Sequence, residues 1–135
     1  MLDINYWAVL VIVVVQAALG AGYYGALGKP WMAAVGLTED RINEKDPVPY
    51  IISMIASALS AIALGIFIKL GGVDTLLGGI AAGVGLGMCF TVSILGRHYA
   101  FAGSIFSDKY RVLIYDGIFD LIGLAIAGAI LVLWQ

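Results

Sequence analysis

The sequence is poor in charged residues, in cysteine and in basic runs, and each shortage excludes a class of protein. Only 12% of its 135 residues are charged and 62% are hydrophobic, whereas soluble domains carry about 25% charged residues. One cysteine, Cys89, leaves no partner for an intrachain disulfide or a CxxC redox pair. A net charge of −2 without a basic run argues against a nucleic-acid partner. The composition therefore indicates an integral membrane protein.

Motifs for catalysis and metal binding are also lacking. The chain contains no HExxH, no GxSxG and no phosphate-binding loop, so we expect no enzyme activity, no cofactor and no metal. No Lys or Arg precedes Lys29. The first apolar segment thus lacks the basic region of a signal peptide, and we expect it to be retained as a membrane helix.

Four apolar segments are long enough to cross a bilayer. A spanning helix needs about 20 mainly apolar residues, and four segments meet this length: residues 6–27, 49–70, 75–95 and 112–134. The short connection 71–74 forces the second and third spans into an antiparallel hairpin, with Asp74 or Thr75 as N-cap. The predicted fold is all-α: a single transmembrane domain over residues 1–135, built as an integral membrane four-helix bundle.

The connection between spans one and two contains an apolar stretch from Pro30 to Gly36. Proline is favoured at the start of a helix and glycine just past its end. We therefore expect a short interfacial helix between spans one and two, lying on the membrane surface.

Basic residues are divided unevenly between the two ends of the predicted bundle. Lys69 lies at the end that carries the termini, and the other six lie in or beside the two long connections. The positive-inside rule then predicts cytoplasmic connections and external termini, in a bacterial inner membrane. The six residues are Lys29, Arg41, Lys45, Arg97, Lys109 and Arg111.

Small residues recur at four-residue spacing on spans two and three. Lipid provides no hydrophobic driving force between helices, so close backbone contact between small residues replaces it. We expect the two stripes to pack on each other within one chain. The alternative is that one stripe forms the seam of a homo-oligomer. The stripes are Gly79, Gly83 and Gly87 on span three, and Ser53, Ser57, Ala61 and Gly65 on span two.

Two carboxylates interrupt the fourth span. Asp116 and Asp120 lie one helical turn apart and so share a face. A carboxylate in hydrocarbon is expensive and normally faces the bundle interior or a wet cavity. The predicted topology puts other polar side chains at the same depth. We therefore expect a cytoplasm-facing polar pocket formed by Asp116, Asp120, Arg97, His98, Tyr23, Tyr24, Ser53 and Ser57.

Two interpretations of these carboxylates remain open. In the structural one, Asp116 pairs with Arg97 or Arg111, or accepts from a tyrosine, and so locks the bundle. In the functional one, the pocket around Asp120 binds a small ligand or a proton. Metal chemistry at His98 is the least favoured, because a lone histidine at a helix end is more often an interfacial residue.

Several stretches resemble one known family along nearly the whole chain. They are NYWAVL at 5–10, LGAGYYG at 19–25, GKPWM at 28–32, GLTED at 36–40, and Gly117, Gly128-Ala129-Ile130 and Trp134 near the end. On these residues the chain resembles the small bacterial four-span membrane proteins catalogued as domain of unknown function 1761. The third connection, 97–111, departs from the family pattern. The resemblance implies the four-span fold and no particular activity.

These features predict a small, non-enzymatic, oligomeric membrane protein whose pocket binds or passes a small solute or proton. The alternative is a structural or accessory subunit that docks a partner through its Gly, Ser and Ala ridges. The expected partners are the lipid bilayer and either a second copy of the chain or a membrane partner protein, with no nucleic acid.

Overall fold

The computed structural model describes residues 4–43, 45–102 and 105–134, and these contain helices and no strand. Helix α1 covers Tyr6–Val35, α2 covers Val48–Leu70 and α5 covers Lys109–Leu133. The third span is continuous and consists of α3 (Leu76–Leu86), the π-helical segment η2 (Gly87–Val92) and α4 (Ser93–Ala100). In the described chain, four helical stretches are long and apolar enough to cross a membrane. The all-α, four-span prediction is confirmed.

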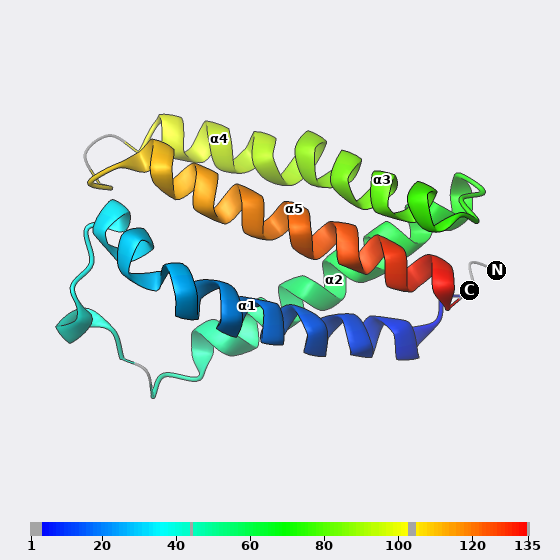
Figure 1. Cartoon of the computed structure of the whole chain (residues 1–135), viewed down its shortest axis with the longest axis horizontal. Coiled ribbons are helices and arrows are strands. Elements are labelled where there is room, and N and C mark those ends of the chain that lie inside the picture. The colour runs from blue at the N-terminus through cyan, green and yellow to red at the C-terminus, as the bar shows by residue number, and fades with distance from the viewer. Residues whose placement is uncertain (1–3, 44, 103–104, 135) are drawn as a thin grey trace.

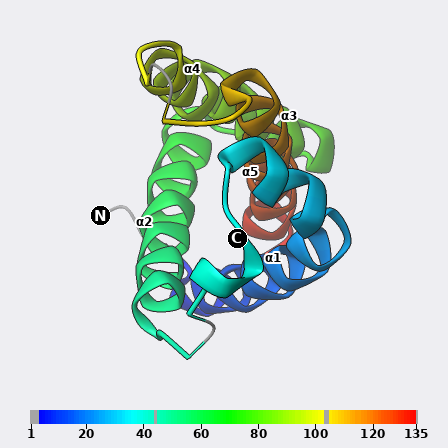
Figure 2. The same ribbon diagram turned by 90° about the vertical axis from the view of Figure 1, so that its left-hand side faces the viewer.

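Helix α5 lies at the centre of the bundle. It packs against α1, α2, α3 and α4, as the two views in Figure 1 and Figure 2 make visible. The α2–α3 turn and the start of α1 lie at the same end of the bundle as the end of α5, which we call the terminal end. The two long connections lie at the opposite end, which we call the loop end.

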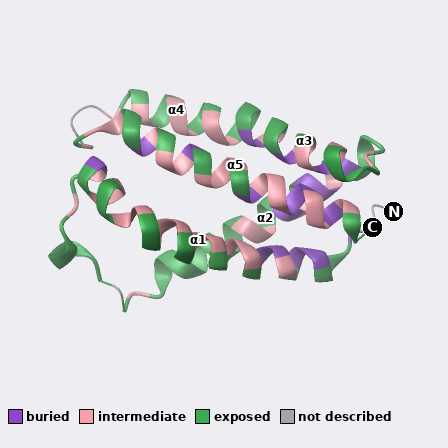
Figure 3. Cartoon of the chain, viewed as in Figure 1, coloured by how far each residue is buried: buried purple, intermediate pink, exposed green. Residues whose placement is uncertain are grey.

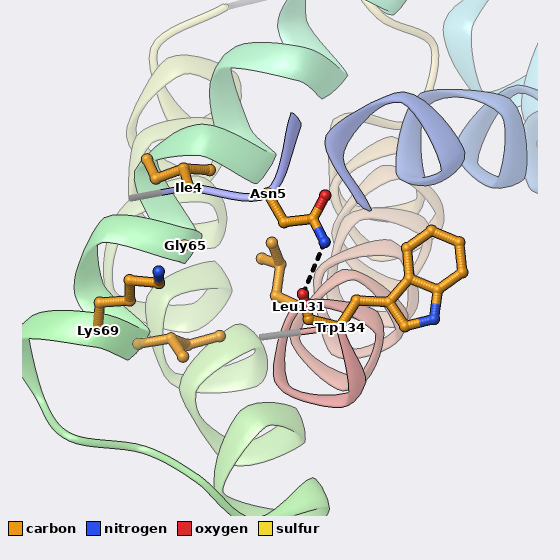
Figure 4. Close-up of a pocket in the computed structure, with 7 residues that line it drawn as sticks. Ile4, Asn5, Gly65, Lys69, Leu131 and Trp134 are labelled. Carbon is orange, nitrogen blue, oxygen red and sulfur yellow. Dashed lines mark hydrogen bonds between the residues drawn. The ribbon is translucent and has the colours of Figure 1, made fainter. Parts of the chain in front are cut away.

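Polar side chains fix the helix starts at the terminal end. The Thr75 hydroxyl accepts from the Gly78 backbone N–H at 3.1 Å, which confirms the predicted N-cap. The Asn5 side chain caps α1, and its Nδ2 donates to the Trp134 carbonyl oxygen at 2.8 Å (Figure 4). The pocket beside this hydrogen bond has a volume of about 10 Å³, barely the room that one water needs. The space beside this hydrogen bond is therefore nearly filled.

The separate interfacial helix predicted between spans one and two does not form. Helix α1 continues through Pro30 to Val35 and ends at Gly36, whose φ of 83° lies in the left-handed region. A proline inside a helix removes one backbone hydrogen bond and bends the helix. The last turns of α1, in cyan, lean over the loop end towards α5 (Figure 2). In the described part of the connection that follows, residues 36–43 and 45–47, the helical structure is the 3₁₀ turn η1 at Glu39–Arg41.

The glycine stripe of the third span packs on α5, and the predicted pairing with α2 is wrong. A Cβ atom added at Gly79 would collide with the carbonyl oxygen of Gly128, and one added at Gly83 with that of Leu124. Gly128 in turn faces the carbonyl oxygen of Gly79. The two backbones therefore touch, which small residues permit between membrane helices and which favours Cα–H···O contacts. The stripe is buried within one chain.

The small-residue stripe of α2 divides between two environments. Ala61 and Gly65 are buried against α1 and α5 at the terminal end. Ser53 and Ser57 lie in the other half of the helix, where every residue from 48 to 56 is exposed. Figure 3 shows this division, with buried residues at the terminal ends of α1, α2 and α5 and an exposed α2 at the loop end. Helix α2 is thus tightly packed at the terminal end only.

The third span changes its helical pitch in the middle. In η2 the Ser93 hydroxyl donates to the Met88 carbonyl oxygen, five positions earlier, at 3.0 Å. A π turn holds one more residue than an α turn. A regular α-helix of about 3.6 residues per turn would return to the face of Gly87 at His98. The additional residue brings Tyr99 to that face instead.

We expect Gly83→Ala to destabilise the bundle by about 1–3 kcal/mol, because a methyl group in this contact forces α3 and α5 apart. The measurement is the midpoint of thermal unfolding in detergent micelles, followed by circular dichroism. Gly85→Ala is the matched control, since nothing lies within 4 Å of its new Cβ and alanine favours the helix. Equal midpoints for the two variants would contradict the α3–α5 contact.

Candidate functional site

Asp116 is the centre of a hydrogen-bonded cluster that joins three spans at the loop end. Its Oδ1 atom accepts from the Tyr24 hydroxyl at 2.9 Å and from the Trp31 indole Nε1 at 2.8 Å. Its Oδ2 atom accepts from the Tyr99 hydroxyl at 2.9 Å. Three donors suit a carboxylate, which in its ionised form only accepts. We call Asp116, Tyr24, Trp31 and Tyr99 the Asp116 cluster.

Aromatic rings hold the loop-end half of α1 on α5. The Tyr24 ring lies 5.5 Å from that of Trp31 and 5.2 Å from that of Phe119, measured between centroids. Neighbouring Tyr23 donates its hydroxyl to the Tyr115 carbonyl oxygen at 2.8 Å. Each such ring pair adds about 0.5–1.5 kcal/mol beyond the area it buries. This part of the bundle is therefore well fixed.

The third connection packs onto the end of α1. The Asp108 backbone N–H donates to the Ala34 carbonyl oxygen at 2.7 Å. The Asp108 carboxylate caps α5 and forms an ion pair with Arg111 at 3.2 Å. Arg111 is thus paired within its own helix start, and the partners of Asp116 are the three neutral donors of its cluster.

Asp120 has a different environment, although it lies only one turn from Asp116. It faces a cavity of about 700 Å³ in the loop-end half of the bundle, to which all four spans contribute. In the part of the chain that the structure describes, no hydrogen bond or ion pair engages the Asp120 carboxylate. The carboxylate is therefore available to a molecule in the cavity.

The cavity has a largely apolar wall with a few polar groups. Its polar lining residues are Gln16, Tyr24, Tyr50, Ser53, Ser57, Ser60, Thr91 and Asp120. Its apolar lining residues are Val13, Ala17, Gly20, Ala21, Met54, Ala56, Phe119 and Leu124. No Lys, Arg or His of the described chain is among them. Of the described residues, Asp120 is thus the one charged group on the wall.

Gln16 marks the inner part of the cavity. Its amide lies against α5, where a Cβ added at Gly123 would come within 2.5 Å of Oε1. The absence of a side chain at Gly123 therefore gives this amide its place between α1 and α5. Further towards the terminal end the core cluster of α1, α2 and α5 fills the bundle, with Ile12 and Leu64 almost fully buried.

The structure brings most of the predicted pocket residues together. Asp120, Tyr24, Ser53 and Ser57 line the cavity. Asp116 lies beside it in its own cluster, and Tyr23 is bonded to the backbone of α5. Arg97 and His98 do not line the cavity and are exposed. The additional residue in η2 accounts for this, because it turns Tyr99 towards α5 and the two basic side chains away.

Other contributors were not in the predicted set. Gln16 and Thr91 interrupt apolar spans, so the sequence carries a signal for them. The sequence carries no such signal for Trp31 and Tyr99, because both lie far from Asp116 along the chain. Among the described residues, no group of three His, Cys, Asp or Glu side chains could hold a metal ion.

Four apolar helices, each long enough to cross a bilayer, make this a multi-pass membrane protein. The chain belongs to the family described as Protein of unknown function (DUF1761), which it matches over residues 7–132. The resemblance noted in the sequence is thereby confirmed. No curated protein and no solved structure matches the chain.

We expect Asp116→Asn to lower the free energy of unfolding by about 2 kcal/mol. The amide nitrogen of asparagine donates and cannot accept, so it would face the hydroxyl or indole donors that now bind the carboxylate. Thermal unfolding in detergent micelles measures the effect. Asp120→Asn makes the same chemical change one turn away without losing a hydrogen bond, so it should shift stability by no more than about 0.5 kcal/mol. Similar losses in both variants would argue against the special role of the Asp116 cluster.

Proposed function

We propose that this protein binds a small solute, or passes the solute or a proton, through a cavity that opens towards the cytoplasm. The observation that carries the proposal is the contrast between its two carboxylates. Asp116 is occupied by three donors, whereas Asp120 faces about 700 Å³ of open space without a protein partner. An intramembrane carboxylate is costly, and a helix bundle built for packing alone would pair it.

The size and lining of the cavity support the same proposal. Sites for small molecules are clefts of about 300–1,000 Å³ with mostly apolar walls and a few placed polar groups. The cavity beside Asp120 has about 700 Å³, with hydroxyls and one amide spread over an apolar wall. Its terminal side is filled by core residues, so access from the loop end is the shorter route.

The charge distribution supports an orientation. Six of the seven basic residues lie in or beside the two long connections, at the loop end of the bundle. Basic residues in such connections are retained on the cytoplasmic side. We accordingly assign the loop end to the cytoplasm and the termini to the outside of a bacterial inner membrane. In this orientation the cavity faces the cytoplasm.

The accessory-subunit function has less support, because the glycine stripe that would dock a partner is occupied by α5. The exposed apolar side chains of α2 offer the other surface for association, with Ile51, Ile52, Ile55 and Leu59 all more than half exposed. We expect lipid or a second copy of the chain to cover this surface. Neither role needs an enzyme mechanism.

Cysteine labelling tests whether the cavity holds water. In a Cys89→Ala background, Ser57→Cys should react with a charged methanethiosulfonate reagent at least about tenfold faster than Ile55→Cys, because the reactive thiolate does not form in lipid. Ser57 lines the cavity, whereas Ile55 lies at nearly the same depth, is 56% exposed and does not line it. Equal, slow labelling of both positions would refute the proposal and favour an accessory role.

The orientation has its own test. With the same reagent added to the outside of intact cells, Asp74→Cys should be labelled and Asp40→Cys should not. Both residues are exposed. Asp74 belongs to the turn between α2 and α3 and Asp40 to the connection between α1 and α2, and these two segments lie at opposite ends of the bundle (Figure 1). In inverted vesicles the pattern should reverse, because a charged reagent does not cross the bilayer. The opposite pattern would place the cavity mouth outside.

A further inference from the structure

We infer that the solute taken by this cavity is a lipophilic monovalent cation, such as an organic ammonium or phosphonium ion. The inference rests on the proposed function and concerns the charge and the shape of the solute. It follows from the composition of the cavity wall, which includes one carboxylate and three aromatic residues and no basic residue of the described chain.

The charges around the cavity favour a cation. Asp120 is the one charged group on the wall, and no basic side chain of the described chain lines the cavity. Asp116, one turn away, is surrounded by neutral donors and adds a second carboxylate without a counter-ion. Like charges repel strongly where water is scarce, so an anion is disfavoured. A single positive charge would match the unpartnered Asp120.

The uncharged part of the wall favours an apolar body around that charge. Tyr24, Tyr50 and Phe119 line the cavity, and aromatic faces attract organic cations. Met54 adds a polarisable thioether. The serine side chains of α2 are small, so they leave volume free and offer oxygen atoms that accept from an ammonium group.

Other solutes fit the wall less well. A transition-metal ion is held by several His, Cys, Asp or Glu side chains, and no group of three such side chains exists among the described residues. A neutral molecule or a lipid chain would leave the Asp120 carboxylate unpaired, at a cost in free energy. A proton alone would not require about 700 Å³ of space. Of these solutes, an organic cation matches both the charge and the volume.

Equilibrium dialysis of the full-length protein in detergent tests the inference with two ions of nearly equal size and opposite charge. Tetraphenylphosphonium should bind saturably to the wild type and to Asp120→Glu, and at least about tenfold more weakly to Asp120→Asn, since a charge partner is lost. Asp40→Asn removes the same charge from the exposed turn η1 and should bind like the wild type. Tetraphenylborate should not bind saturably to any of them.

Protection of the cysteine variant locates the bound ion. Bound tetraphenylphosphonium should protect Ser57→Cys, so its labelling rate should fall in proportion to the fraction of protein that has bound the cation. The labelling rate of Asp40→Cys should not change. The inference fails if tetraphenylborate binds as well as the cation, if Asp120→Asn binds undiminished, or if the cation does not bind while Ser57→Cys still reacts rapidly. Slow labelling of Ser57→Cys without any ligand would instead overturn the proposed function as well.

Discussion

The backbones of α3 and α5 touch at Gly79, Gly83 and Gly128, and the rest of the bundle is arranged around this contact. In lipid, helices gain little from burying apolar side chains against one another, so close packing must supply the attraction. The contact fixes the third span on α5 and thereby sets the position from which Tyr99 reaches Asp116. The first, third and fourth spans are thus held together at the loop end. The buried residues of α2 lie between Ala61 and Ile68, towards the terminal end.

The two carboxylates of α5 have different environments because their neighbours differ. Asp116 accepts from residues of α1 and α4, and this use of its oxygen atoms makes it a structural centre. Asp120 points into the volume that α2 leaves open at the loop end. A shared helix face therefore does not imply a shared environment. The helix supplies the spacing, and the neighbouring spans decide which carboxylate is occupied.

Hydropathy and local chemistry were sufficient to predict the four spans, an N-cap at Asp74 or Thr75 and a helix end at Gly36, since each depends on nearby residues. They did not predict that the helix ending at Gly36 is the continuation of α1. The partner of the glycine stripe was not predictable in this way. Both α2 and α5 carry small residues, and the spacing of small residues along a helix does not say which neighbouring helix it contacts. The helix through Pro30 was missed because later contacts hold its last turns, including that of Trp31 with Asp116. Arg97 and His98 were assigned to the pocket from their depth alone. Depth does not say which face of the helix a side chain occupies, and the wide turn η2 shifts that face.

The π-helical segment also bears on how sequences of this kind can diverge. A single wide turn absorbs one inserted residue without rotating the helix on either side of it. Loss of one residue between Gly87 and Ser93 would therefore convert η2 into ordinary α-helix and leave both the glycine contact and the tyrosine that follows in register. Only the side chains of the turn itself, Thr91 among them, would change direction. Chains that differ in length by one residue here can thus share one bundle and differ in the wall of its cavity.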